Sequence, residues 1–221
     1  MTLTQSLTAP DTTADSWRAP AGWPVMSLQQ IEGMLCAPGQ PFEMDTISID
    51  GIATRCWKNA PPSLAALAQI ARLHGDKTFL VYEDERVSYD AWFRAAATLA
   101  HHLQAAGIGK GDTAALAMRN LPEWPVAFFA SVSTGAIAVP LNAWWTGAEL
   151  AYGLADSGAK LLIADAERLD RIAPHLGEIP ALEAMLISRS TGDLPAPAHR
   201  LEDVIGTPPA YAALTAAELP A

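Results

Sequence analysis

The sequence is poor in basic residues and in charged clusters. Lysine and arginine together number 14 against 24 acidic residues, which gives a formal net charge of −10 over 221 residues. Nucleic acids and anionic membrane surfaces are bound by clustered basic side chains, so we expect neither as a partner. The nearest approach to a basic cluster, Arg168 and Arg171, stands beside acidic residues at Asp165, Glu167 and Asp170.

Cysteine is also scarce, occurring only as Cys36 and Cys56. Two cysteines at this spacing provide neither a disulfide framework nor a metal site. A reducing compartment, and hence a cytoplasmic location, is therefore the expectation. The first basic residue is Arg18 and no apolar run precedes it, so the sequence predicts no signal peptide.

Motifs for catalysis and for metal binding are missing as well. No GxSxG nucleophile motif occurs, and no His–carboxylate pair has metal-ligand spacing. His101 and His102 are neighbours on an expected helix, so they point in different directions. The glycines of 107–111 follow a helix and lead into a strand, the reverse of a nucleotide-binding loop. We therefore assign no catalytic residue, no cofactor-binding residue and no metal ligand in this chain.

The longest stretch without charge, 124–148, passes the filter for a membrane span of about 20 apolar residues. Its internal serines, threonines, glycine and prolines argue against a span. Asn120 and Glu123 have the spacing of a helix N-terminal cap pair, and Gly135 is suited to end that helix. We predict a buried helix and then a buried strand over 136–139, which would form the centre of a parallel sheet.

Apolar runs and helical patterns alternate along the middle of the chain. The runs typical of strands lie at 78–83, 113–118, 136–139, 160–164 and 184–188. Helical segments separate most of them, and Thr146 with Glu149 forms a capping box for one of these helices. This alternation predicts an α/β fold with a doubly wound, mainly parallel sheet.

The chain is expected to divide into four parts. Residues 1–24 form a flexible, disordered arm rich in Thr, Ser, Pro and Ala. Residues 25–75 hold a short helix, a β-hairpin turning at Asp50-Gly51, and a lead-in helix with an apolar face. Residues 76–190 are the parallel-sheet domain, and 191–221 are an irregular tail rich in Pro and Ala.

Four residues define a candidate ligand-side surface. Trp144 and Trp145 follow the strand over 136–139, and Arg119 and Asn120 follow the strand that ends at Met118. Ligands of open α/β sheets bind beyond the carboxyl ends of the strands. The structural alternative has the two indoles packed over the sheet edge and Asn120 capping the next helix, and the residue types favour this alternative.

An ordered set of motifs resembles the AMP-forming acyl-adenylating enzyme superfamily. The set comprises Val87-Ser88-Tyr89-Asp90, Arg119-Asn120 with Glu123, Ser133-Thr134-Gly135-Ala136, Val139-Pro140-Leu141-Asn142, Thr146 with Glu149-Leu150, and Asp156-Ser157-Gly158-Ala159-Lys160. The similarity runs from roughly Ser63 to Ser188 and is greatest to acyl-CoA synthetases of the fatty-acid-CoA ligase type.

The resemblance implies a parent enzyme that activates a carboxylic acid with ATP and magnesium and then transfers the acyl group to CoA. The family's phosphate loop, ribose-binding aspartate, hinge and C-terminal domain do not occur in this sequence. We therefore expect an N-terminal scaffold portion, inactive alone, whose partner is the remainder of the synthetase chain. The alternative is a non-catalytic binding or assembly module. Apolar surface left uncovered around Trp144 and Trp145 predicts self-association.

Overall fold

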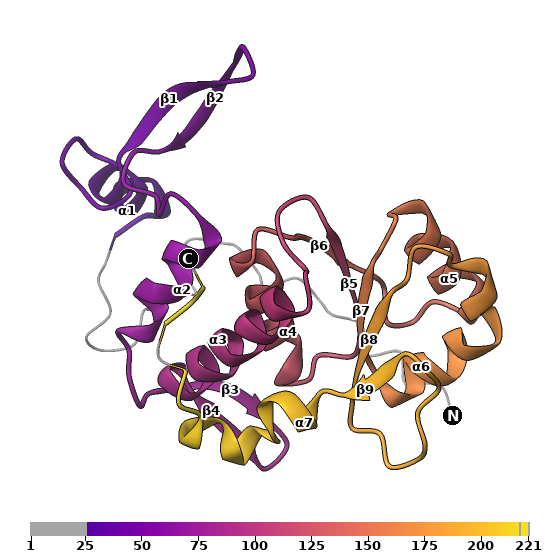
Figure 1. Ribbon diagram of the computed structural model, residues 1–221. Helices are drawn as coiled ribbons and strands as arrows, with labels where there is room; N and C mark the ends of the chain where they lie inside the picture. Colours follow the sequence, from indigo (N-terminus) through magenta and orange to yellow (C-terminus); the bar gives the residue numbers. More distant parts are fainter. Residues whose placement is uncertain (1–25, 217, 221) are drawn as a thin grey trace, which may run out of the picture. The chain divides into compact units, whose positions relative to one another are not determined.

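The computed structural model describes residues 26–216 and 218–220. The chain divides into two compact units, Met1–Ala60 and Pro61–Ala221 (Figure 1). The arm expected over residues 1–24 lies outside the described residues. The boundary between the units, after Ala60, falls within the segment 25–75 that the sequence pattern placed together.

The first unit contains one helix and one hairpin. Helix α1 (Leu28–Leu35) begins with a capping box, in which the backbone N–H of Gln30 donates to Ser27 Oγ and the backbone N–H of Ser27 donates to Gln30 Oε1. Strands β1 (Met44–Ile49) and β2 (Ile52–Trp57) pair antiparallel around Asp50 and Gly51, both of which have positive φ. The short helix and the hairpin are confirmed. No side chain of residues 26–60 is buried.

The second unit carries the α/β fold. Its elements are α2 (Leu64–Arg72), β3 (Thr78–Tyr82), β4 (Glu85–Ser88), α3 (Tyr89–Ala105), β5 (Thr113–Ala117), α4 (Glu123–Ser133), β6 (Ile137–Pro140), α5 (Gly147–Asp156), β7 (Leu161–Asp165), α6 (Ala166–Ile172), the 3-10 helix η1 (Ala173–Glu178), β8 (Ala184–Ser188), β9 (Ala198–Arg200), α7 (Glu202–Ile205) and the 3-10 helix η2 (Pro208–Ala213). Strands β3 and β4 form an antiparallel pair, and the other five form one parallel sheet in the order β6-β5-β7-β8-β9.

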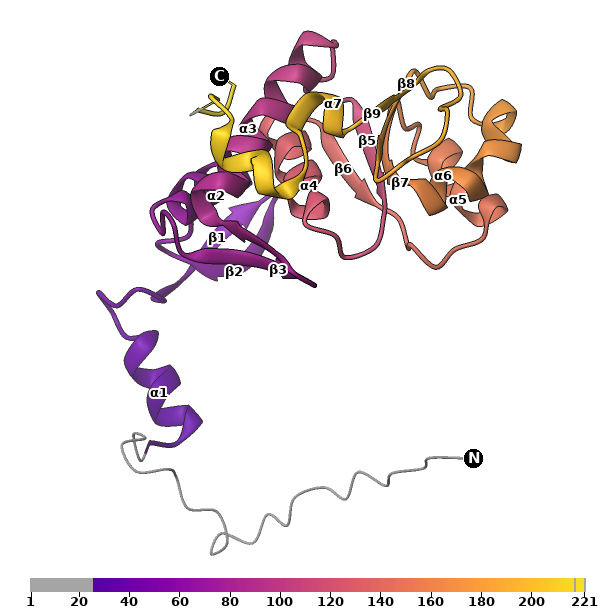
Figure 2. The same ribbon diagram turned by 90° about the horizontal axis from the view of Figure 1, so that it is seen from below.

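Side chains of the parallel strands alternate between two hydrophobic cores. Leu116, Ile163 and Leu186 point to the face that α3 and α4 cover, whereas Leu162 and Ile187 point to the face that α5 and α6 cover. Figures 1 and 2 show these two helix pairs on opposite sides of the sheet. The period of two follows from the pleat of a β-strand. The doubly wound α/β fold is therefore confirmed.

The strand predicted to be the centre of the sheet is instead its edge. β6 pairs only with β5 among the described strands, and Ile137 is 55% exposed. All five residues of β7, by contrast, are buried. Pro140 lacks a backbone N–H, which suits an edge strand. The uncharged stretch 124–148 thus forms α4, β6 and the start of α5, and no helix of the described chain is long and apolar enough to cross a bilayer.

The cap predicted for one helix is wrong, and the apolar face of another helix is exposed. Asn120 does not cap α4, because the N-cap residue is Pro122 and no side chain bonds to the helix start. The apolar face of α2 is not buried: Leu64, Leu67 and Ile70 are each more than 40% exposed. Helical periodicity shows that a helix has an apolar face, but it does not show what covers that face.

The segment after residue 190 is more ordered than the tail expected from its prolines. β9 pairs in parallel with β8, with Met185 opposite Ala198, and thereby adds a fifth strand to the sheet. Leu201, Ile205 and Tyr211 are buried against the α3 face of the sheet. A strand of three residues is too short to show a period of two in the sequence.

Candidate functional site

A hollow of about 480 Å³ lies at the carboxyl ends of β5, β7 and β8. After β5 the chain passes to α4 on one face of the sheet, and after β7 it passes to α6 on the other, so the connections diverge here. Ligands of open α/β sheets bind at such a topological switch point. We call this the switch-point hollow. It is lined by Tyr82, Arg119, Asn120, Leu121, Ala143, Trp144, Asp165, Ala166, Glu167, Arg168 and Arg189.

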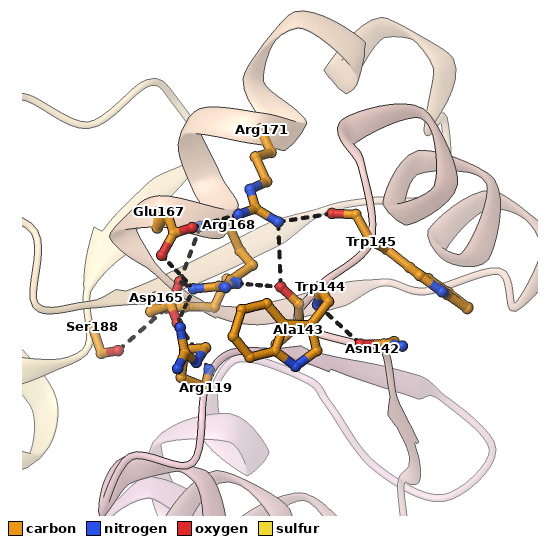
Figure 3. A network of polar contacts seen from close by, with 11 residues as sticks. Arg119, Asn142, Ala143, Trp144, Trp145, Asp165, Glu167, Arg168, Arg171 and Ser188 are labelled. Carbon is orange, nitrogen blue, oxygen red and sulfur yellow. Dashed lines mark hydrogen bonds and ion pairs between the residues drawn. The ribbon is translucent and has the colours of Figure 1, made fainter. Parts of the chain in front are cut away.

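Asp165 ties the ends of two strands together at the base of the hollow. Its Oδ2 accepts the backbone N–H of Arg119 at 2.9 Å, and its Oδ1 accepts the backbone N–H of Arg168 at 3.0 Å (Figure 3). The Arg168 guanidinium donates from Nη1 to both carboxylate oxygens. Asp165 is therefore the N-cap of α6 and a bridge from β7 to the chain leaving β5.

Arg168 is fully buried, and most of its donors are used. Nε donates to the Ala143 carbonyl oxygen at 2.8 Å, and Nη1 also reaches Glu167 at 2.9 Å. Nη2 is buried and has no hydrogen-bond partner among the described residues. Buried polar groups are rarely left unpaired, so this unpartnered nitrogen is an exception within an otherwise satisfied network.

Arg119 and Trp144 form the outer wall of the hollow. The Arg119 guanidinium carbon lies 4.1 Å from the centroid of the Trp144 ring, a cation–π arrangement. Trp144 is 67% exposed, and its backbone N–H donates to Asn142 Oδ1. In the described part of the chain Arg119 makes no ion pair. The wall therefore presents one cation and one aromatic side chain to solvent.

The structure separates Trp145 from the other three candidate residues. Arg119, Asn120 and Trp144 all line the hollow, whereas the Trp145 ring packs in the α5 core beside Leu141 and Gly153. Its carbonyl oxygen accepts a hydrogen bond from Arg171 Nη1 at 3.0 Å. Trp145 therefore packs as a structural residue and does not line the hollow.

Arg189 holds a second polar cluster at the rim, which we call the Arg189 clasp (Glu85, Glu123 and Arg189). Its Nε donates to Glu123 at 2.9 Å, and its Nη2 donates to Glu85 at 2.7 Å and to Glu123 at 3.2 Å. Glu123 is only 2% exposed. The Arg189 backbone has φ of 56°, and its N–H donates to Glu202.

Burial and pairing act in opposite directions on the clasp. Desolvation raises the pKa of Glu123 above its usual value, and the hydrogen bonds from Arg189 oppose that rise. Desolvation alone would lower the pKa of Arg189, but its bonds to Glu85 and Glu123 outweigh it and raise the pKa. Glu123 and Arg189 therefore form a charged pair, in which the ionised form of Glu123 depends on the hydrogen bonds from Arg189.

The sequence did not point to Asp165, Arg168 or Arg189 as site residues. In the sequence, Arg168 and Asp165 stand out only as members of a cluster too acidic to bind nucleic acid. Glu123 gave one signal, since it is the only charge between Arg119 and Ala148. An isolated acid beside a long apolar run is expected to find a buried partner.

The hollow is suited to binding rather than to acid–base chemistry. Asp165 and Glu167 are both paired with Arg168, so their carboxylates do not fit as ligands for a magnesium ion. The described residues contain no group of three or more His, Cys, Asp or Glu arranged to hold a metal. The exposed Arg119 and Trp144 together favour a planar or anionic group.

Comparison with known proteins identifies the family. Residues 67–213, more than half of the chain, match the family described as AMP-binding enzyme. A medium/long-chain-fatty-acid–CoA/3-oxocholest-4-en-26-oate–CoA ligase of Mycobacterium marinum is 31% identical over 118 residues, which cover 53% of this chain and 22% of the relative. A 2-succinylbenzoate–CoA ligase of Bacillus subtilis is 36% identical over 99 residues, covering 45% and 20%.

Solved structures agree with this match. The anthranilate CoA ligase AuaEII in complex with anthranoyl-AMP has a TM-score of 0.54 at 27% identity, covering 57% of this chain and 24% of that one. Coronafacic acid ligase from Pectobacterium brasiliense has a TM-score of 0.62 at 21% identity, covering 72% and 31%, and supports the fold alone. The chain spans only about a quarter of the length of these relatives. It belongs to the AMP-binding enzyme family and is similar to a part of the acyl-CoA ligases named above.

Proposed function

We propose that this chain is the N-terminal scaffold part of a cytoplasmic, ATP-dependent acyl-CoA synthetase and is inactive alone. In the parent reaction a carboxylate attacks the α-phosphorus of ATP, which gives an acyl-adenylate and pyrophosphate. The thiol of CoA then attacks the acyl carbon and releases AMP. ATP, magnesium and CoA are thus the cofactors and co-substrate of the parent protein. The observation that carries the proposal is the family match over 67–213.

The acid that the parent activates is not selected by this part of the chain. The relatives with similar identity are described as ligases of fatty acids, of 2-succinylbenzoate and of ferulate. A segment shared at this level by ligases of aliphatic and aromatic acids is a common framework. Fatty acid metabolism is one setting consistent with the first of these relatives.

The switch-point hollow is the part of this framework that we propose to face a ligand. Asp165 and Arg168 fix the ends of β5 and β7, so the backbone that carries Arg119 and Trp144 is held in place. Rigid support for a binding surface reduces the ordering that a ligand must impose. Trp144 and Arg119 would then contact a planar or anionic part of a reactant, whereas Arg168 would position them.

Two measurements on the 221-residue chain test the proposal. With ATP, magnesium, CoA and a mixture of carboxylic acids, we expect no release of pyrophosphate. Calorimetry with ATP and magnesium should show no tight stoichiometric binding. Tight binding of one ATP per chain would contradict the view that the phosphate-binding parts lie elsewhere.

The same assay on the longer protein separates the synthetase from the alternative of a non-catalytic module. If the reading frame continues beyond Ala221 into a phosphate loop, a protein that includes it should release pyrophosphate in the presence of its acid. A stop codon at this point, or a longer protein without adenylation activity, would favour the module and would refute the synthetase assignment.

A further inference from the structure

The loop between β6 and α5, residues 141–146, carries Trp144 past the carboxyl ends of the strands. The Trp144 side chain belongs to neither of the hydrophobic cores that the described residues form, and the side chain it stacks on, Arg119, is itself exposed. An exposed cation–π contact is weak, so it does not fix an indole in one place. The position of this wall of the switch-point hollow therefore depends on the backbone of the loop.

The two ends of the loop are anchored to the sheet and to α5. The backbone N–H of Leu141 donates to the Leu116 carbonyl oxygen at 2.8 Å, which continues the pairing of β6 with β5. At the other end Thr146 is the N-cap of α5, and Glu149 completes its capping box. Neither anchor bonds to the carbonyl oxygens of the residues next to Trp144.

Two arginines of α6 hold the carbonyl oxygens on either side of Trp144 (Figure 3). Arg171 Nη1 donates to the Trp145 carbonyl oxygen at 3.0 Å and to the Ala143 carbonyl oxygen at 3.4 Å. Arg168 Nε donates to the same Ala143 oxygen at 2.8 Å. The Arg171 guanidinium thus bonds both to the residue before Trp144 and to the residue after it.

Glu167 holds the two arginines in place. Its Oε2 accepts a hydrogen bond from Arg168 Nη1 at 2.9 Å, and its Oε1 accepts one from Arg171 Nη2. Both bonds are charge-assisted, and Arg171 follows Glu167 by four residues, a spacing at which side chains on one helix face meet. The Arg171 guanidinium is therefore oriented by α6 through one nitrogen and donates to the loop from the other.

Burial separates the roles of the two arginines. Arg168 is fully buried and bonds to Asp165 at the base of the hollow, so its loss would disturb the strand ends as well as the loop. The Arg171 side chain is 32% exposed, and its other described partners besides Glu167 are the two loop carbonyl oxygens. Replacing Arg171 therefore removes support from the loop and leaves the bonds of Asp165 in place.

We propose that Arg171 is a positioning residue for Trp144. It does not line the switch-point hollow, and it acts through the backbone of the loop. Without its two hydrogen bonds the loop keeps its anchored ends but loses the geometry that directs the indole toward Arg119. This role follows from the contacts alone, whereas an effect on turnover rests on the proposed function of the hollow.

Fluorine NMR of the full 221-residue chain, labelled with 5-fluorotryptophan, tests the role directly. Each of the seven tryptophans contributes one resonance, and Trp144→Phe assigns the resonance of Trp144. Arg171→Met keeps the apolar stem and removes the guanidinium, so we expect the Trp144 resonance to shift and broaden. The resonance of Trp92, which is buried in the core on the other face of the sheet, should stay in place.

Arg86→Met is the matched control. Arg86 also donates from Nη1 to two carbonyl oxygens, those of Glu83 and Glu85, but these belong to the turn and strand β4 rather than to the Trp144 loop. This variant should leave the Trp144 resonance where the parent chain has it. Both methionine variants should keep the circular dichroism spectrum of the parent.

A longer protein that releases pyrophosphate allows a kinetic test of the same role. Arg171→Met and Trp144→Ala should each lower kcat/KM several-fold for the same substrate. Because Arg171 acts through Trp144, the double variant should lose no more than Trp144→Ala alone.

An unmoved Trp144 resonance in Arg171→Met, or an equal change in Arg86→Met, would overturn the proposal. A change at Trp92 or in the circular dichroism spectrum of Arg171→Met would assign the arginine to the stability of the whole fold and would also overturn it. Losses that multiply in the kinetic double variant would refute the action through Trp144. If no longer protein releases pyrophosphate, the proposed function fails, and the fluorine resonances still decide the role of Arg171.

Discussion

Removing the arginine of the clasp is expected to destabilise the protein through the carboxylate that remains. Arg189→Met keeps the apolar stem but leaves Glu123, at 2% exposed, without its two charged hydrogen bonds. Removing one partner of a buried pair costs about 3–5 kcal/mol. The Arg189 side chain is 31% exposed and solvent screens the pair, so we expect the lower end, about 3 kcal/mol. Urea unfolding followed by circular dichroism measures this loss.

The loss should depend on pH in a defined direction. Without Arg189, only the hydrogen bond of Glu123 with its own backbone opposes the desolvation that raises the pKa of this carboxyl above its usual 4.5. The folded state of the variant then holds a proton that the unfolded state has released, so its stability falls as pH rises from about 4.5 through the raised pKa. Arg189→Met should therefore approach the parent chain at low pH and differ most from it at neutral pH.

A second substitution tests whether the carboxylate is the cause. Adding Glu123→Gln to Arg189→Met removes the uncompensated charge, so the double variant should recover most of the lost stability and lose the extra pH dependence. Glu85→Gln is the control, because Glu85 is 27% exposed in its pair with Arg189 and an exposed pair contributes less than about 1 kcal/mol. A double variant as unstable as Arg189→Met, or a penalty that does not change with pH, would refute this reasoning.

Three other expectations can be checked by the same unfolding assay or by sedimentation. Gly147→Ala should lose about 1–3 kcal/mol, because a methyl group there overlaps the Arg171 carbonyl oxygen, whereas Gly192→Ala, which has open space, should lose nothing. Trp145→Ala should cost roughly 2–3 kcal/mol and Trp144→Ala less than about 1 kcal/mol, since only the first indole packs in a core. We propose that the exposed apolar face of α2, which continues to the C-cap residue Leu73 (84% exposed), drives self-association. Leu73→Lys should therefore reduce it in sedimentation velocity; an unchanged distribution would contradict this.

Local signals in the sequence were sufficient to place most of the elements. β8 was expected at 184–188 and has those bounds, and the capping box of Thr146 and Glu149 begins α5 as predicted. Both features depend on neighbouring residues, so a short window of sequence contains them. The rule that ligands bind beyond the carboxyl ends of parallel strands also groups Arg119, Asn120 and Trp144, which line the hollow, with Trp145, which does not.

Features that depend on distant partners were not available from the sequence. The apolar run of β6 has the composition of a central strand, yet only the crossover through α5 decides that β7 joins the other side of β5. The clasp joins Glu123 to a residue 66 positions away, and Asp165 bonds to a backbone 46 positions away. Such contacts leave no local period, and a single sequence does not show which acid meets which base.

The order of the strands has a consequence for synthesis. Once β5, α4 and β6 have left the ribosome, each later strand adds to one growing side of the sheet, in the order β7, β8, β9. Each of β7, β8 and β9 therefore pairs with the exposed edge of a strand that is already in the sheet. None of them has to insert between two strands that are already paired. The pairing can keep pace with elongation, and the newest edge is covered by the strand that emerges next.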